Sequence, residues 1–149
     1  MILPYIDYCS TSWGSSAKIH LDKIQKLLNK YARMLLKKIY NTSQISLLQS
    51  LKWQSVDQRI KYQYCALVYK IMNNLVPNHL KPLVCKRPVK YRTRFSLRCP
   101  LQLPKARTEY KRRSFAYVGP KLFNALPSNL QACTSLLVFK KLCKAFHTN

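Results

Sequence analysis

Basic side chains dominate the chemistry that this sequence offers. Its 149 residues include 27 Lys and Arg against 4 Asp and Glu, a formal net charge of +23 with a pI near 10.1. A small domain needs a net charge of only about 2–8 to be soluble. In a compact state, so many like charges repel one another. The composition therefore favours a polyanionic partner.

Two stretches of the chain gather these cations. In residues 17–39 four of them recur every three or four positions, which places them on one face of a helix: Lys26, Lys30, Arg33 and Lys37. Between residues 81 and 113 Glu109 is the single acid among many cations, and the ones that we expect to hold a phosphate backbone are Arg92, Arg94, Arg98, Arg107, Lys111, Arg112 and Arg113.

Aromatic residues are interleaved with the second stretch, namely Tyr91, Phe95, Tyr110 and Phe115. Such rings can stack on unpaired bases, and Arg grips phosphates with two donors at once. The pattern therefore favours RNA or single-stranded DNA over a duplex read in its groove. Three other interpretations stay open: a merely solvated basic face, a cationic helix lying on an anionic membrane surface, and a protein-interaction or scaffold module that presents Tyr62 and Tyr69 to a partner.

The sequence shows no recognisable arrangement of catalytic residues. An enzyme that acts on phosphates usually needs carboxylates that share a metal ion, whereas the acids here are isolated: Asp7, Asp22, Asp57 and Glu109. Two glycines, Gly14 and Gly119, do not suffice for a glycine-rich phosphate loop. A nucleophilic Cys with a His base remains possible, because such partners meet in space. We expect no catalytic residue and no enzyme activity.

Six cysteines stand at positions 9, 65, 85, 99, 133 and 143. The chain opens without a secretory signal, so we expect a reduced intracellular protein, nuclear or cytoplasmic, and no stretch is long and apolar enough for membrane insertion. Structural zinc sites bring ligands in close pairs, and the pairs Cys133–Cys143 and His79–Cys85 are too widely spaced. We expect no metal site and no cofactor, with Cys65 and Cys143 as buried, small hydrophobic side chains.

Apolar periodicity predicts a mainly α fold. A helix is expected over 17–39 with Leu21, Ile24, Leu28, Tyr31 and Leu35 inward, and a short one over 43–51 with Ile45, Leu48 and Leu51 inward. Ser55-Val-Asp57-Gln58 is a capping box. It should begin a central helix that buries Val56, Ile60, Tyr64, Leu67, Val68, Ile71 and Leu75 on one face, with Tyr62, Ala66 and Tyr69 on another.

Prolines punctuate the rest of the chain. We expect a short helical turn at 78–84, a strand or hairpin arm near 90–98, a helix over 114–126 that Gly119-Pro120 interrupts, and a last helix from 134 or 135 to 146. The predicted fold is a small helical bundle with a basic, proline-rich extended arm or hairpin and C-terminal short helices. Its segments are a helical region (1–84), the arm (85–113) and a C-terminal helical segment (114–149) that packs back to form one structural unit.

Five sequence segments give the chain a resemblance to a known family. They are LPYIDYCSTSWG (3–14), LDKIQKLLNKYARMLL (21–36), LLQSLKWQSVDQRIKYQYCALVYKIMNNLVPNHL (47–80), RRSFAYVGPKLFNALP (112–127) and SLLVFKKLCKAF (135–146). In this order they resemble the segment after the polymerase core in LINE-type non-LTR retrotransposon proteins of the jockey and chicken-repeat kind. The chain departs from that pattern at Lys111, where the family usually has Gly, and at Phe123, where Trp is common.

The resemblance implies a thumb-like, C-terminal extension of a reverse transcriptase. Its partners would be element RNA or a template-primer and the upstream polymerase core. The catalytic aspartates of the family lie upstream, in a palm whose Tyr-Ala-Asp-Asp-type motif this chain lacks. We therefore expect a nucleic-acid-binding fragment that is inactive alone, and the alternative is a scaffold that docks on the missing polymerase body.

Overall fold

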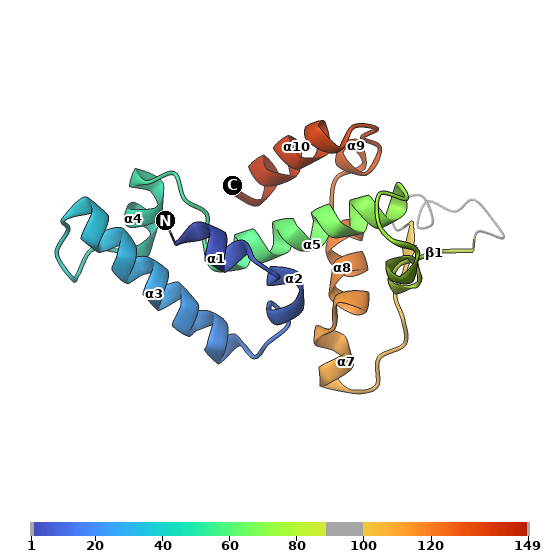
Figure 1. Cartoon of the computed structure of the whole chain (residues 1–149), viewed down its shortest axis with the longest axis horizontal. Helices are drawn as coiled ribbons and strands as arrows, with labels where there is room; N and C mark the ends of the chain where they lie inside the picture. Colours follow the sequence, from blue (N-terminus) through green and yellow to red (C-terminus); the bar gives the residue numbers. More distant parts are fainter. Residues whose placement is uncertain (1, 89–99, 149) are drawn as a thin grey trace. The chain divides into compact units, whose positions relative to one another are not determined.

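The computed structural model describes residues 2–88 and 100–148, and it is mainly helical (Figure 1). This confirms the predicted fold class. The chain divides into two compact units, Met1–Ile60 and Lys61–Asn149, and the boundary falls inside helix α5 (Val56–Met72). The division into three sequence segments stays a prediction. Among the described helices, none is long and apolar enough to cross a membrane.

The first unit contains four helices ahead of α5. They are α1 (Leu3–Asp7), α2 (Ser10–Trp13), α3 (Lys18–Leu36) and α4 (Gln44–Ser50). The two helices predicted from periodicity correspond to α3 and α4. Ser43 caps α4, because its hydroxyl accepts a hydrogen bond from the Ser46 N–H at 3.3 Å.

A chain of side-chain amides around the buried Asn29 fixes α3 within this unit. Gln25 donates to Asn29 Oδ1 at 2.8 Å, and Asn29 donates to Gln44 Oε1 at 3.2 Å. Gln25 Oε1 also accepts a hydrogen bond from the Val56 N–H at the start of α5, at 2.8 Å. The buried amide of Asn29 thus both accepts and donates a hydrogen bond, and these bonds help to set which face of α3 turns inward.

That inward face differs in part from the predicted one. Leu28 and Ala32 are fully buried, as is Leu47 of α4, but Leu35 is 52% exposed and Ile45 is 69% exposed. The prediction for Leu35 and Ile45 was wrong, because the bonds of Asn29 hold the Leu28–Ala32 side of α3 against α4. Tyr31 stacks on Trp53 with ring centroids 6.1 Å apart, and Asp7 pairs with Arg59.

Helix α5 begins as the sequence predicts. The Gln58 N–H donates to Ser55 Oγ at 3.3 Å, and the Ser55 N–H donates to Gln58 Oε1 at 2.9 Å, which is the reciprocal capping box. Its later turns are buried on more than one side, at Tyr64, Cys65, Ala66, Val68, Tyr69 and Ile71. Leu75, predicted inward, is 56% exposed because the helix has already ended at Met72.

The second unit begins with the later turns of α5. It contains η1 (Asn78–Leu83), β1 (Cys85–Lys86), β2 (Leu101–Gln102), α7 (Glu109–Arg113), α8 (Phe115–Asn124), α9 (Ser128–Gln131) and α10 (Leu136–Thr148). The turn predicted at 78–84 is η1. Strands β1 and β2 are antiparallel, with Cys85 opposite Gln102. The hairpin predicted near 90–98 lies outside the described residues.

Aromatic stacking organises the core of this unit. Tyr69 stacks on Phe139 with centroids 4.3 Å apart, and Phe139 meets Phe123 at 6.2 Å. The Tyr69 hydroxyl donates to the Cys133 carbonyl at 2.9 Å. Tyr69 is therefore an internal residue with 2% exposure, and the hypothesis that it faces a partner protein was wrong.

Two local predictions in this unit need correction. Helix α8 runs without interruption through Gly119 and Pro120. Glycine is required there, because a Cβ on Gly119 would stand 2.9 Å from Val68 Cγ2. The end of the predicted extended arm is helical, since Thr108 accepts a hydrogen bond from the Lys111 N–H at 3.3 Å and starts α7.

Candidate nucleic-acid interface

The exposed side of α3 and the turn after it form a basic hollow. It has a volume of about 990 Å³ and is lined by Lys23, Lys26, Leu27, Asn29, Lys30, Arg33, Met34, Lys37, Lys38 and Tyr40. Six of these ten residues are cationic and none is acidic. We call this surface the α3 basic hollow; it lies wholly within the first unit.

Helical geometry explains why these cations lie together. The positions 23, 26, 30 and 33 advance by three or four residues, so their side chains leave the helix within about 80° of one another and spread over about 15 Å of its axis; Lys37 follows at the C-cap. The structure thus brings together all four cations that the sequence singled out on this helix. Lys23, Lys38 and Tyr40 were not among the predicted residues.

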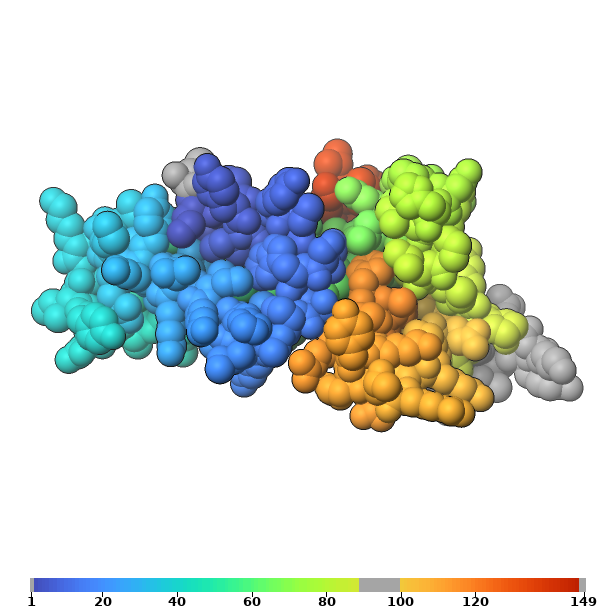
Figure 2. All heavy atoms as spheres, turned by 60° about the horizontal axis from the view of Figure 1, so that its bottom comes forward, coloured from blue at the N-terminus to red at the C-terminus, as the bar shows by residue number. Residues whose placement is uncertain are grey.

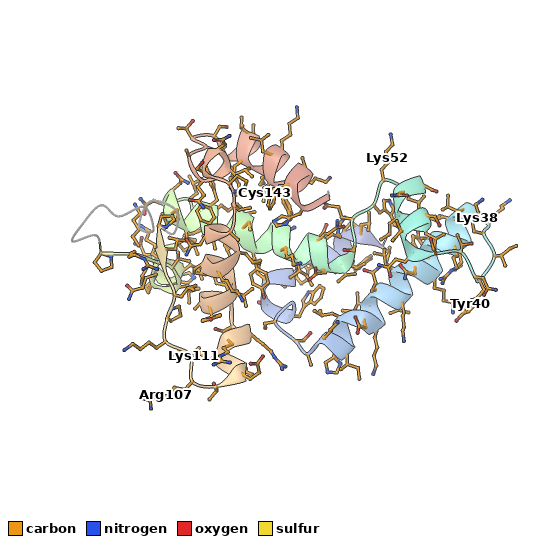
Figure 3. The ribbon with its side chains drawn as sticks, turned by 180° about the vertical axis from the view of Figure 1, so that it is seen from behind. Lys38, Tyr40, Lys52, Arg107, Lys111 and Cys143 are labelled. Carbon is orange, nitrogen blue, oxygen red and sulfur yellow. The ribbon has the colours of Figure 1, made fainter. Side chains whose placement is uncertain are left out.

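Arg33 links α3 to the turn that follows it. Its guanidinium lies over the Tyr40 ring, 5.2 Å from the centroid, and its Nη2 donates to the Thr42 carbonyl at 3.5 Å. Lys37, in the left-handed conformation with φ 49°, ends the helix and turns the chain back toward Arg33. Tyr40 is nevertheless 82% exposed, and Lys38 and Tyr40 both project outward in Figure 3.

The α3 basic hollow also contains exposed apolar surface. Leu27 is 61% exposed and Met34 is 68% exposed. Figure 2 shows side chains standing out from the α3 and α4 segment (blue to cyan). Unopposed cations next to exposed apolar and aromatic groups suit a ligand with anionic and flat apolar parts.

A second basic surface lies around α7 in the other unit. Arg107, Lys111, Arg112 and Arg113 are all exposed there, and Arg107 and Lys111 project outward in Figure 3. Arg112 lines a hollow of about 680 Å³ together with Lys105, Lys121 and Glu109. Arg113 pairs with Glu109 at 3.3 Å, so part of its charge is neutralised. The predicted contacts Arg92, Arg94 and Arg98 lie outside the described residues.

A buried thiol–imidazole cluster lies between α5 and α10. Cys65, Cys143 and His147 each offer one ligand atom, and these atoms all lie within 4.8 Å of one another. Cys65 Sγ is 3.7 Å from His147 Nε2. Both sulfurs belong to fully buried residues, as predicted, but the sequence analysis missed their meeting with a histidine. The signal that could have shown it is the spacing of Cys143 and His147 by one helical turn.

The two thiols of this cluster differ in acidity. The pKa of Cys143 is lowered to about 6, first because Cys65 donates a hydrogen bond to its sulfur; burial opposes that shift, and the hydrogen bond and charge of His147 assist it. The pKa of Cys65 is raised, first by the same hydrogen bond and then by burial. The arrangement therefore favours one thiolate, at Cys143.

Comparison with known proteins adds no relative from which function could be transferred. No family model, curated protein or solved structure matches the chain. What the chain can do chemically must come from its own side chains. Among the residues that the structure describes, they provide a concentration of cations in the α3 basic hollow and around α7, and a set of soft metal ligands in the buried cluster.

Proposed function

We propose that this chain binds single-stranded RNA or DNA as the non-catalytic, C-terminal part of a LINE-type retrotransposon reverse transcriptase, inside the cell. The observation that carries the proposal is the α3 basic hollow, in which six cations and an exposed tyrosine line one cavity without an acid. Cations without neutralising partners create a positive potential that attracts a phosphate backbone.

The lysines of the hollow supply an affinity that does not depend on sequence. Lys26, Lys30 and Lys37 are exposed and occupy one row along the helix. Phosphates that contact them release condensed counterions, and binding then weakens as salt rises. Tyr40 adds a face on which an unpaired base can stack, which favours single strands over duplexes.

The α7 surface extends this function. Arg107, Lys111 and Arg112 are exposed, and Arg holds phosphates through two parallel donors. We include Arg92, Arg94 and Arg98 in the same role on sequence grounds. The resemblance to the region after a polymerase core supports element RNA or a template-primer as the ligand, and it implies that the family's catalytic aspartates lie in an upstream palm.

A charge-matched comparison tests the proposal. We expect the variant Lys26→Gln/Lys30→Gln/Lys37→Gln to bind a single-stranded RNA oligonucleotide about tenfold more weakly or worse, a loss of about 1.4 kcal/mol. Fluorescence anisotropy at fixed salt measures this. The control Lys18→Gln/Lys52→Gln/Lys141→Gln removes the same charge from exposed positions that do not line the hollow. Equal losses in the two variants would remove the hollow from the proposal.

A second candidate function is docking on a polymerase body. It is favoured by the large apolar side chains that the first unit exposes, which include Ile19, Leu35, Ile39 and Ile45. Burial of exposed apolar side chains against a partner is favourable, and contiguous groups of them mark protein-binding surfaces. Salt separates the two candidates, because contacts with phosphates weaken steeply as salt rises and apolar contacts do not.

A further inference from the structure

We propose that Cys65, Cys143 and His147 form a zinc site that fastens α10 to α5. The three residues come from elements that are far apart in the sequence, since 82 positions separate Cys65 from His147. Cys143 belongs to α10 and points toward α5 in Figure 3. This inference concerns the second unit and is independent of nucleic-acid binding.

Helix α10 positions two of the three ligands. Cys143 and His147 are four residues apart in α10, so their side chains lie one turn apart on the same face. Two zinc ligands at this spacing on one helix can bind a single ion without any change in the backbone. Cys65 then needs only to approach from the facing helix, where Val68 and Tyr69 pack it into the core.

The distances agree with a tetrahedral site. With Zn–S of about 2.3 Å and Zn–N of about 2.0–2.1 Å, tetrahedral angles place a sulfur and a nitrogen ligand about 3.6 Å apart. The observed distance from Cys65 Sγ to His147 Nε2 is 3.7 Å. All three ligand atoms fall within 4.8 Å of one another, so small side-chain rotations complete the geometry.

The donor set selects the metal. Zinc binding would displace the remaining thiol proton, and two thiolates with an imidazole are soft or borderline ligands, which bind Zn²⁺ in preference to Mg²⁺ or Ca²⁺. Both sulfurs are fully buried, which hinders a substrate but not a small ion, while His147 is half-buried and lies toward solvent. The three residues leave the fourth position of the ion to water or another small ligand.

Zinc binding by the intact, reduced chain tests the site. We expect one Zn²⁺ per chain by metal analysis after dialysis, and Co²⁺ in its place should give the visible absorption of a tetrahedral thiolate complex. Cys143→Ser and His147→Gln should each weaken Zn²⁺ binding by more than about 100-fold, beyond the loss expected for an outer-shell partner. His147→Cys, which keeps a ligand at the same position, should retain the ion.

Control variants separate the cluster from the other thiols. Cys9→Ser and Cys85→Ser remove exposed cysteines and should leave Zn²⁺ binding unchanged. His147→Gln changes a half-buried residue, so circular dichroism should show a folded chain even if Cys143→Ser unfolds. The proposal is overturned if the reduced chain binds no stoichiometric zinc, if folded His147→Gln binds it normally, or if Cys65 and Cys143 are found joined as a disulfide.

Discussion

Arg33 combines two tasks at the end of α3. It contributes charge to the α3 basic hollow, and it holds the turn after the helix through the Tyr40 ring and the Thr42 carbonyl. Lysine can supply the charge but not the planar stack or the forked donors. Charge alone therefore does not describe this position.

Replacing Arg33 by Lys should thus disturb binding although the net charge is kept. We expect Arg33→Lys to weaken single-stranded RNA binding about two- to fivefold, as the loss of a contact worth about 0.5–1 kcal/mol implies. Lys30→Arg, which also exchanges one cation for another but at an exposed position, is the control and should bind like the wild type. Anisotropy titrations of both would contradict this reasoning if the two variants bound equally well.

Tyr40 gives a second test at the same scale. Its ring is 82% exposed, and base–aromatic stacking contributes about 1–3 kcal/mol per base. Tyr40→Ala should therefore weaken RNA binding about 5- to 150-fold, whereas Tyr40→Phe keeps the ring and should bind almost normally. If Tyr40→Phe lost as much affinity as Tyr40→Ala, the hydroxyl and not the ring would be the contact.

Among the candidate site residues, the sequence could predict those that are brought together by regular helical spacing alone. Lys26, Lys30 and Lys37 were predictable because helical periodicity alone aligns them. Lys38 and Tyr40 were not predictable, because their positions depend on the left-handed turn at Lys37. No local sequence pattern indicates that turn. Cys143 and His147 were readable from their spacing, but their contact with Cys65 requires the packing of two helices.

At the level of elements, helix α5 depends on the capping box at its start. The Ser55 hydroxyl accepts a hydrogen bond from the Gln58 N–H, and Gln58 returns one to the Ser55 N–H. We expect Ser55→Ala to lower the free energy of unfolding by about 0.5–2 kcal/mol. Urea denaturation measures the change.

A matched cap gives the comparison for that prediction. Ser43→Ala removes the corresponding hydroxyl bond at the start of α4. Helix α4 has seven residues, whereas α5 has 17 and fills a core. Ser43→Ala should therefore destabilise the chain less than Ser55→Ala, and a larger effect at Ser43 would show that α5 is not the central element.

The last helix, α10, should respond to zinc. A ligand that binds only the folded state at 100 times its dissociation constant stabilises that state by about 2.7 kcal/mol. For a chain of this length, that amount raises Tm by roughly 5–10 °C. Thermal denaturation with and without a chelator measures the shift, and His147→Gln should abolish it.

Helix existence was largely predictable, whereas helix ends and faces were not. The periodicity of α3 and α5 and the Ser55 capping box predicted both helices. Leu35 was placed inward wrongly, because a repeat shows which residues share a face but not where the neighbouring element stops covering it. Leu75 was placed inward wrongly, because the apolar repeat continues past the end of the helix at Met72. The sequence analysis took Gly119-Pro120 as a helix break, whereas Gly119 serves a tertiary contact, the close approach of Val68.

At the scale of the whole molecule, both compact units present basic surface, but the hollow and the thiol–imidazole cluster lie in different units. The α3 basic hollow lies in the first unit, and the Cys65–Cys143–His147 cluster lies in the second. We expect His147→Gln to abolish zinc binding while RNA affinity changes less than twofold. A large loss of RNA affinity in this folded variant would show that zinc binding and RNA binding are coupled.

The salt dependence of single-stranded RNA binding tests the central claim most directly. Six phosphate contacts predict a slope of log Kobs against log salt near roughly −4, and removing three of them with Lys26→Gln/Lys30→Gln/Lys37→Gln should bring it to about −2. The control Lys18→Gln/Lys52→Gln/Lys141→Gln should keep the wild-type slope. An unchanged slope in the first variant, or a flat response in the wild type, would contradict a phosphate-binding α3 basic hollow.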